Sequence, residues 1–340
     1  MNILVTGGAG YIGSHTIIEL QNDGHHVVSV DNYLTSSPDT YKRIQSVTGI
    51  EVPHYHCDLT SPEETEAIFH KHQFDAVIHF AALKLVGESV LNPTLYYRNN
   101  LNALINILQC MEKYSCKNLI FSSSCSVYGN SPHIPVTEKE PFGFPESPYA
   151  ATKQISEILL QSFIKTQSFS KCISLRYFNP VGAHPSGFIG EIQQTPNNLL
   201  PVIMHSVIKN KPFTVFGNHY PTPDGTCIRD YIHVSDVAKA HVAALAFLDK
   251  MNSENRLEVF NIGTETGNSV LELIHSFEKE SGIKLNYSMG EKRAGDIAQI
   301  YADISKAKKI LQWQPLYTLD ETMKTAWRWL CKMKEENILQ

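Results

Sequence analysis

The sequence lacks the residue spacings that mark metal sites and disulfide frameworks. Its seven cysteines include no Cys-x-x-Cys pair, and its 15 histidines are scattered without a His-Glu-x-x-His pattern. The odd number of cysteines, several of them inside apolar runs, is typical of reduced, buried thiols in a cytosolic protein. We therefore expect no bound metal and a cytoplasmic location.

Long hydrophobic runs, basic clusters, repeats and low-complexity segments are also missing. No apolar run reaches the length of a membrane span and no secretory signal pattern stands at the first residues, so we expect no membrane partner. A formal net charge of −5 without a basic run argues against a nucleic-acid partner. Hydrophobic residues make up 42% of the 340 residues and charged residues 19%, which argues against disorder. This length suits two domains, or one large domain with an appended lobe.

The first residues of the chain read as a strand, a tight turn and a helix. The apolar run 3–5 is followed by Gly7, Gly10 and Gly13, and residues 11–20 have the pattern of an amphipathic helix. Gly7 permits a sharp turn, Gly10 permits a pyrophosphate to approach the backbone, and Gly13 permits tight packing of the helix. The N–H groups and the positive dipole end of this helix would then face the phosphates.

A second apolar strand, residues 26–30, ends in Asp31, about 20 residues after the glycines, where a ribose-binding acid is expected. A carboxylate there accepts hydrogen bonds from both ribose hydroxyls and repels a 2′-phosphate, so NAD is favoured over NADP. A second interpretation is a structural glycine turn followed by an aspartate that caps the end of the strand.

Strand and helix patterns alternate through the first half of the chain. This alternation predicts an α/β fold of the Rossmann type, a doubly wound parallel sheet with helices on both faces. Ser61, Pro62 and Glu64 predict a helix start with a closed capping box, and Asp58 just before it would bind the adenine amino group or help to cap. The expected strands are 3–6, 27–30, 52–57, 76–80, 118–123 and 172–177, and the expected helices are about 12–22, 62–72, 99–114 and 149–167.

The composition of the sequence changes near Asn179, where proline and glycine become frequent and the alternation of strand and helix patterns becomes irregular. We therefore expect residues 1–178 to form a dinucleotide-binding domain and residues 179–340 to form a smaller mixed α/β substrate lobe. Residues 235–263, a helix followed by a strand, are expected to rejoin the first domain. The lobe should cover the carboxyl ends of the strands, where doubly wound sheets bind their ligands.

A candidate catalytic group follows the fifth strand. That strand ends in Ser122-Ser-Ser124, and Tyr149 and Lys153 lie four residues apart, on one face of a helix. A free tyrosine is a poor base at neutral pH, but a lysine ammonium and a positive nicotinamide ring both favour the phenolate. The phenolate could accept a proton from a substrate hydroxyl that Ser124 hydrogen-bonds. An ordinary tyrosine–lysine pair on a helix surface would have the same spacing.

At these residues the sequence resembles the extended short-chain dehydrogenase/reductase family, and within it the UDP-glucose (UDP-galactose) 4-epimerases. The resemblance covers nearly the whole chain. Its more diagnostic motifs are Lys84-Leu-Val-Gly-Glu-Ser89 and Asn179-Pro-Val-Gly-Ala-His-Pro185. The others include Thr6-Gly-Gly-Ala-Gly-Tyr-Ile-Gly13, Ile78-His-Phe-Ala-Ala82, Pro196-Asn-Asn-Leu199 and Arg229-Asp-Tyr-Ile-His233.

The resemblance implies roles for individual residues. Tyr149 would be the base, Ser124 would position the reacting hydroxyl, and Lys153 would hold the nicotinamide ribose. Residues expected to bind NAD are Gly7, Gly10, Tyr11, Ile12, Gly13, Asp31, Asn32, Asp58, Leu59, Phe80, Ala81, Ala82, Lys84, Asn99, Ser122, Tyr149, Lys153, Tyr177 and Phe178. Residues expected to bind the UDP-sugar are Lys84, Ser124, Tyr149, Asn179, Asn198, Leu199, Phe216, Arg229, Arg293, Asp296 and Ile300.

The implied activity is a redox-neutral epimerisation at C4 of a UDP-hexose, through a transient 4-keto sugar and tightly bound NAD. Ile300 stands where the family often carries an aromatic or a small residue, so activity on UDP-N-acetylhexosamines is left open. A homodimer through helices 99–114 and 149–167 is also expected from the resemblance.

Three rival functions use the same scaffold. A nucleotide-sugar 4,6-dehydratase commonly has Asp-Glu after the serine run, whereas this chain has Cys125-Ser126. A sugar-nucleotide dehydrogenase would consume free NAD stoichiometrically. A non-catalytic, NAD-sensing Rossmann protein would often lack the Tyr149/Lys153 pair, which this chain keeps.

Overall fold

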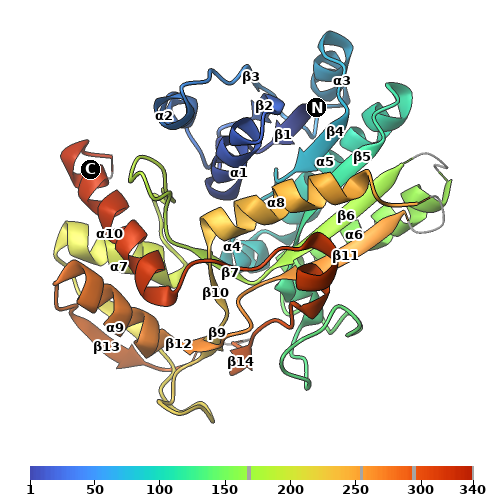
Figure 1. Ribbon diagram of the computed structural model, residues 1–340. Helices are drawn as coiled ribbons and strands as arrows, with labels where there is room; N and C mark the ends of the chain where they lie inside the picture. The colour runs from blue at the N-terminus through green and yellow to red at the C-terminus, as the bar shows by residue number, and fades with distance from the viewer. Residues whose placement is uncertain (167–169, 253–255, 293–295, 339–340) are drawn as a thin grey trace.

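The core of the fold is a seven-stranded sheet in the order β11-β6-β5-β4-β1-β2-β3, with every neighbouring pair parallel (Figure 1). The computed structural model describes residues 1–166, 170–252, 256–292 and 296–338. The strands are β1 (Asn2–Thr6), β2 (His26–Asp31), β3 (His54–His56), β4 (Ala76–His79), β5 (Asn118–Ser124), β6 (Lys171–Tyr177) and β11 (Leu257–Ile262).

Helices cover both faces of this sheet, because alternate residues of its strands point to opposite sides. In β1, Ile3 and Val5 belong to a core shared with α1 and α8, whereas Leu4 belongs to a core shared with α3, α5 and α6. The expected doubly wound sheet is therefore confirmed. The helices of this part are α1 (Tyr11–Asn22), α2 (Asp39–Thr48), α3 (Pro62–Lys71), α4 (Val86–Leu91), α5 (Pro93–Lys113), α6 (Pro148–Thr166) and α8 (Val234–Leu248), and the short 3-10 helix η1 (Cys125–Tyr128) follows β5.

A third core lies between helices from the second half of the chain. It is built from side chains such as Ile203 of α7, Phe277 of α9 and Trp329 of α10. The elements of the second half are α7 (Leu199–Lys209), α9 (Val270–Ser281), α10 (Leu319–Glu335) and the short strands β7 (Asn179–Val181), β8 (Phe213–Phe216), β9 (Ile228–Arg229), β10 (Tyr231–His233), β12 (Asn268–Ser269), β13 (Tyr287–Gly290) and β14 (Gln299–Ile300). The π-helix η2 (Ala307–Leu311) instead packs against α8 and β11 and contributes to the core shared with α1 and α8. The exact division of the chain into a cofactor domain and a substrate lobe stays a prediction, although β11 pairs with β6 in the large sheet.

Several local expectations differ from the structure. The third strand is confined to His54–His56, helices α2 and α4 had not been expected, and α5 begins six residues before residue 99. The capping box at Ser61 is only half formed. The Ser61 hydroxyl accepts the Glu64 N–H at 3.2 Å, but the Glu64 carboxylate accepts the N–H of Asp58 at 2.9 Å. Complete boxes occur instead at Ser269–Glu272 and Thr318–Glu321.

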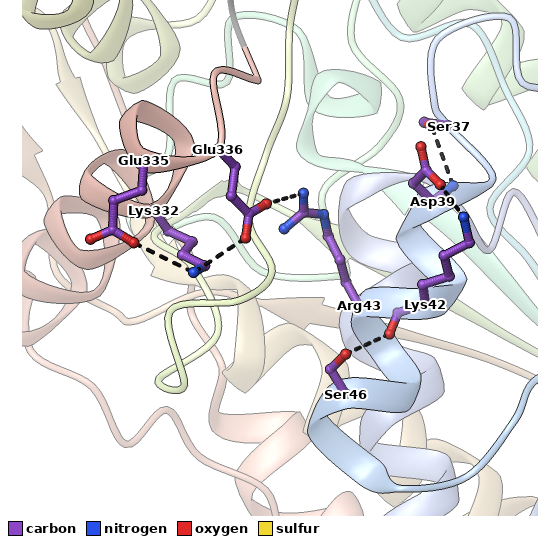
Figure 2. Close-up of polar contacts among 8 residues, drawn as sticks. All are labelled: Ser37, Asp39, Lys42, Arg43, Ser46, Lys332, Glu335 and Glu336. Carbon is purple, nitrogen blue, oxygen red and sulfur yellow. Dashed lines mark hydrogen bonds and ion pairs between the residues drawn. The ribbon is translucent and has the colours of Figure 1, made fainter.

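The end of α10 is joined to α2 by a small polar cluster, which Figure 2 shows. Arg43 of α2 donates to the carboxylate of Glu336 at 2.5 Å, and Lys332 lies 3.3 Å from the same carboxylate. The Arg43 guanidinium also lies 5.5 Å from the ring centroid of Trp329. These contacts join the C-terminal helix α10 to α2, which belongs to the first half of the chain.

Two buried histidines are kept neutral by burial, and backbone groups decide which ring nitrogen carries the proton. His233 Nδ1 accepts the N–H of Ser235 at 3.0 Å, so it carries no proton. His241 Nδ1 lies 2.8 Å from the Val237 carbonyl and must donate to it, which leaves Nε2 to accept the Tyr177 hydroxyl at 2.5 Å. Burial lowers the pKa of His233 to about 3 and that of His241 to about 4.

We expect these histidines to make the fold acid-sensitive. The pKa of a histidine in the unfolded chain is about 6.5. Between that pH and about 4, these histidines are therefore protonated in the unfolded chain but remain neutral in the native state. Stability should fall as pH falls, by up to about 1.4 kcal/mol per pH unit for each such histidine.

Urea unfolding at pH 6.5 and 5.0 should show a smaller pH dependence of the free energy of unfolding in His241→Gln than in wild type. The exposed His70→Gln variant should behave as wild type, and equal pH dependence in all three proteins would contradict the assignment.

Candidate active site

The turn between β1 and α1 is shaped by two close backbone approaches. Gly7 has φ +69°, and a Cβ there would lie 2.8 Å from the N atom of Ala81. A Cβ on Gly13 would lie 2.4 Å from the Gly7 carbonyl oxygen. Gly10 precedes α1 without a side-chain cap, and the first turn, which begins at Tyr11 and Ile12, contains no acidic residue. The N–H groups of such a turn have no intrahelical partner, so the residues present fit a diphosphate.

The Asp31 carboxylate links this turn to the end of β2. It accepts hydrogen bonds from the N–H of Ala9 at 3.1 Å, the N–H of Tyr33 at 2.9 Å and the hydroxyl of Ser36 at 2.8 Å. Burial raises the pKa of Asp31, and these hydrogen bonds oppose that shift. Asp31 therefore stabilises the end of its strand, while its carboxylate still stands beside the glycine turn. Its role toward a ribose stays a prediction.

The neighbouring residues at this edge mainly stabilise turns. The side chain of Asn32 accepts the N–H of Leu34 at 3.1 Å. The Asp58 carboxylate accepts both the N–H and the hydroxyl of Thr60, at 2.9 and 2.8 Å. Leu59 is buried. Because β2 and β3 are adjacent and parallel, the structure brings Asp31 and Asp58 to the same edge of the sheet.

The residues after β4 lie against the glycine turn. The N–H of Ala81 donates to the Thr6 hydroxyl at 3.3 Å, and the ring of Phe80 lies 4.7 Å from that of His241. Ala82 follows directly, and Lys84 donates to the Glu191 carboxylate at 2.6 Å.

Asn100 was missed by the sequence analysis and holds this segment in place. Its side chain bonds both the N–H and the carbonyl of Leu83, at 2.8 and 3.0 Å, and also donates to the Thr152 hydroxyl at 3.1 Å. The predicted cofactor residue Asn99 donates to the side chain of Asn100 at 3.0 Å. An asparagine on the buried face of a helix is the signal that could have found it.

The three predicted catalytic residues come together at the ends of β5 and α6. Lys153 donates to the Ser122 carbonyl at 2.6 Å, and its Nζ lies 5.8 Å from the ring centroid of Tyr149. Burial raises the pKa of Tyr149 to about 12, although a hydrogen bond with Ser124 opposes the shift. Burial also lowers the pKa of Lys153 to about 8, which Glu157 opposes. In the protein alone, burial therefore sets the pKa of Tyr149, and the lowering expected from Lys153 together with a nicotinamide ring stays a prediction.

A buried ion pair lies directly behind these residues. Arg176 of β6 donates to both oxygens of Glu157, at 2.9 and 2.6 Å, and the Ser123 hydroxyl donates to Glu157 at 2.5 Å. Arg176 also donates to the Tyr128 hydroxyl at 2.9 Å. Glu157 is one helical turn after Lys153, and a carboxylate on this buried face could have been noticed in the sequence. The cluster fixes the ends of β5, β6 and α6 relative to one another.

The residues that follow β6 lead into the second half of the chain. Tyr177 is the register partner of Ser124 in the sheet, and Phe178 is buried beside it. The N–H of Asn179 donates to the carbonyl of Asp230 at 2.9 Å. Within the described part of the chain, the buried Oδ1 atom of Asn179 has no hydrogen-bond partner. An orphaned polar atom at the end of a sheet strand fits a ligand that donates to it.

The remaining predicted substrate residues are spread over β8, β9, β14 and α7. Arg229 lies 4.0 Å from the Asp296 carboxylate and pairs in register with Ile300, which is buried. Asn198 precedes α7 without a side-chain cap, and Leu199 is the first residue of that helix. Phe216 ends β8 and is 45% exposed. The positive charge of Arg229 also acts on Cys125, which places this arginine near the serine run. Arg293 lies outside the described residues.

The comparisons with known proteins agree with this arrangement. Residues 3–263 match the model of the NAD dependent epimerase/dehydratase family. The chain belongs to this family. The UDP-glucose 4-epimerase of Bacillus subtilis (strain 168) is 45% identical over 331 residues, which cover 97% of this chain and 96% of that protein.

The similarity to solved structures covers almost the whole chain. A UDP-glucose 4-epimerase from Stenotrophomonas maltophila, with bound NAD and formylated UDP-arabinopyranose, superposes with a TM-score of 0.94 at 43% identity, covering 99% of both chains. The enzyme from Bifidobacterium longum, in complex with NAD⁺ and UDP, has a TM-score of 0.93 at 44% identity, covering 98% of both chains.

The described ranges contain no group of three or more histidine, cysteine or acidic side chains that could hold a metal ion. Within the same ranges, no helix combines the length and the apolar character that crossing a membrane requires.

The crowding at Gly13 predicts a loss of NAD binding in Gly13→Ala. The added methyl group would meet backbone atoms of the turn rather than a side chain that could move. Overpacking of this kind costs about 1–3 kcal/mol, so we expect NAD to bind about 5-fold to 150-fold more weakly. The NAD content of the purified protein, released by denaturation and assayed enzymatically, measures this. Gly87→Ala is the matched control, because a Cβ at Gly87 meets no atom within 4 Å. Equal NAD content in both variants would refute the assigned role of the turn.

Proposed function

We propose that this chain interconverts UDP-galactose and UDP-glucose by redox-neutral epimerisation at C4, with NAD as a tightly bound cofactor. The observation that carries the proposal is the meeting of Ser124, Tyr149 and Lys153 at the sheet edge that also carries the glycine turn. The proposal is also supported by the similarity of this chain to UDP-glucose 4-epimerases over nearly its whole length.

The residues around the glycine turn would hold the cofactor. The N-terminus of α1 would receive its diphosphate, Asp31 its adenosine ribose, and Lys153 its nicotinamide ribose. When bound, NAD accepts and returns the hydride at C4, and its oxidised ring adds a positive charge to the site.

Tyr149 would accept the proton of the 4-hydroxyl and later return it, while Ser124 holds that oxygen by a hydrogen bond. Burial makes the phenolate costly in the protein alone, with a pKa of about 12 for Tyr149. A buried phenol responds strongly to nearby positive charge, because the surrounding dielectric is low. The base would therefore become effective only in a site that has been loaded with its cationic partner.

The second half of the chain would anchor UDP. Guanidinium groups bind diphosphate oxygens in a bidentate manner, so Arg229 and Arg293 would hold the diphosphate. Phe216 and Asp296 would contact the nucleoside, and Asn179, Asn198 and Leu199 would complete the site. Binding energy from UDP is remote from C4, so the 4-keto sugar can turn about its link to UDP and expose its other face.

A dehydratase would need a second acid/base pair, which is commonly Asp-Glu after the serine run. Cys125 and Ser126 occupy the positions that would carry Asp-Glu, and burial raises the pKa of the Cys125 thiol to about 12. A neutral thiol with such a pKa is a poor replacement for a carboxylate at neutral pH. Activity on UDP-N-acetylhexosamines, which depends on the space around Ile300, stays a prediction.

The oligomeric state proposed here is a homodimer through α5 and α6. Exposed apolar side chains support it, among them Ile105 of α5 and Ile155 and Ile158 of α6. Ile158 is 50% exposed and lies one helical turn from Ile155, so the two form a continuous apolar strip. A cytoplasmic location is also proposed, and the seven unpaired cysteines support it.

Tyr149→Phe tests the assigned base. Removing the hydroxyl removes the proton acceptor, so kcat should fall by about 100-fold to 10,000-fold while NAD remains bound. The turnover of UDP-galactose and the NAD content are measured on the same preparation. Tyr55→Phe, on the edge strand β3, serves as the control and should keep full turnover. Wild-type activity in Tyr149→Phe would rule out this base.

Ile158→Glu tests the proposed dimer. A charge in the middle of the apolar strip cannot be buried between two subunits without a large desolvation cost, so the variant should be monomeric. Light scattering after size-exclusion chromatography gives the mass directly. Ile50→Glu places the same charge on an exposed isoleucine outside these helices and should remain dimeric. A monomeric wild type at working concentration would contradict the proposal.

A further inference from the structure

An ion pair joins the segment after β4 to the segment between β7 and α7. Lys84 donates to the Oε1 atom of Glu191 at 2.6 Å, and Gln193 donates to the same oxygen at 2.6 Å. The Glu191 side chain is only 11% exposed, whereas that of Lys84 is 46% exposed. The carboxylate is therefore the fixed partner, and the lysine is the partner that can be withdrawn.

Glu191 is held from the side of the third core. Its backbone carbonyl accepts the indole N–H of Trp329 at 3.0 Å, and Trp329 is almost completely buried in α10. The carbonyl of Gln193, two residues later, lies 2.7 Å from Nε2 of His205 in α7. These bonds attach the Glu191 segment to two helices that belong to the same core.

The pair lies beside the side chain of Tyr11, the first residue of α1, whose N-terminus is where the cofactor diphosphate is expected. Lys84 Nζ is 5.8 Å from the ring centroid of Tyr11, the first residue of that helix. The Tyr11 hydroxyl donates to the carbonyl of Gly182 at 2.7 Å. Burial raises the pKa of Tyr11, and the negative charge of Glu191 raises it further. The carboxylate and the lysine therefore both act on the side chain of Tyr11.

A diphosphate that binds in this region meets Lys84, whose ammonium group is already paired with the Glu191 carboxylate. It must draw Lys84 away from Glu191 or share it, and it must also tolerate the nearby carboxylate. We propose that Glu191 is a positioning residue that occupies Lys84 and competes with a bound diphosphate for it. This inference rests on the proposed function, in which the diphosphate belongs to the UDP-sugar or to NAD.

Glu191→Gln tests the competition, because it removes the charge and keeps the shape of the side chain. UDP is titrated calorimetrically into the NAD-loaded enzyme. Because the lysine end of this ion pair is well exposed, the pair is worth about 1 kcal/mol or less, and we expect the Kd for UDP to fall by about two- to fivefold. In the Lys84→Met background the same substitution should have a smaller effect, because the contested cation is gone.

A second arm follows the cofactor. The rate at which NAD leaves each variant on dilution shows which diphosphate competes with Glu191. Tighter UDP binding alone assigns the competition to the substrate, slower NAD loss alone assigns it to the cofactor, and both together assign it to both. An unchanged or weaker affinity for both ligands in Glu191→Gln would overturn the inference.

Arg43→Gln is the matched control. It breaks the ion pair with Glu336, which also joins the end of α10 to the first half of the chain (Figure 2). Lys84 is paired with Glu191 instead. We expect its UDP and NAD binding to equal that of wild type. If Arg43→Gln tightens UDP or NAD binding as much as Glu191→Gln does, the cause is a weaker contact between the first and second halves of the chain. The inference would then be wrong. If the wild-type protein itself does not bind UDP, the proposed function fails first, and the inference fails with it.

Discussion

The close approach of Gly7 to Ala81 is the constraint on which the rest of the site depends. It occurs where β1 ends between its neighbours β4 and β2, and it leaves no space for a side chain on Gly7. The chain can then turn tightly enough for the N-terminus of α1 to point along the carboxyl edge of the sheet. Asp31 ties the same turn to β2. One steric requirement therefore sets the direction of the helix and the place of the neighbouring polar groups.

The proposed catalytic residues Tyr149 and Lys153 are buried, and this has a chemical consequence. Burial raises the pKa of Tyr149 to about 12 and lowers that of Lys153 to about 8, so both groups are shifted toward their uncharged forms. The nearby Glu157–Arg176 pair is buried but internally satisfied, which makes it a stable support. In the proposed mechanism, Tyr149 therefore becomes an effective base only when additional positive charge is present.

The sequence predicted the features that are encoded locally. The strand–helix alternation, the glycine turn and the Tyr149/Lys153 spacing each depend on a short stretch of chain with a recognisable period. The contacts that could not be predicted join residues far apart in sequence. Lys84 with Glu191 and Arg43 with Glu336 are paired only because α10 and its core pack where they do. The half-formed capping box at Ser61 has the same origin, because Glu64 turns to the Asp58 backbone once the end of β3 is in place.

The most direct test of this account supplies UDP-galactose to the purified protein without added NAD and follows the formation of UDP-glucose by chromatography. Interconversion without net formation of NADH is the predicted result, because the cofactor is bound and ends each turnover as it began. No conversion, even after NAD is supplied, would contradict the assignment of C4 epimerisation, and stoichiometric accumulation of NADH would indicate a dehydrogenase instead.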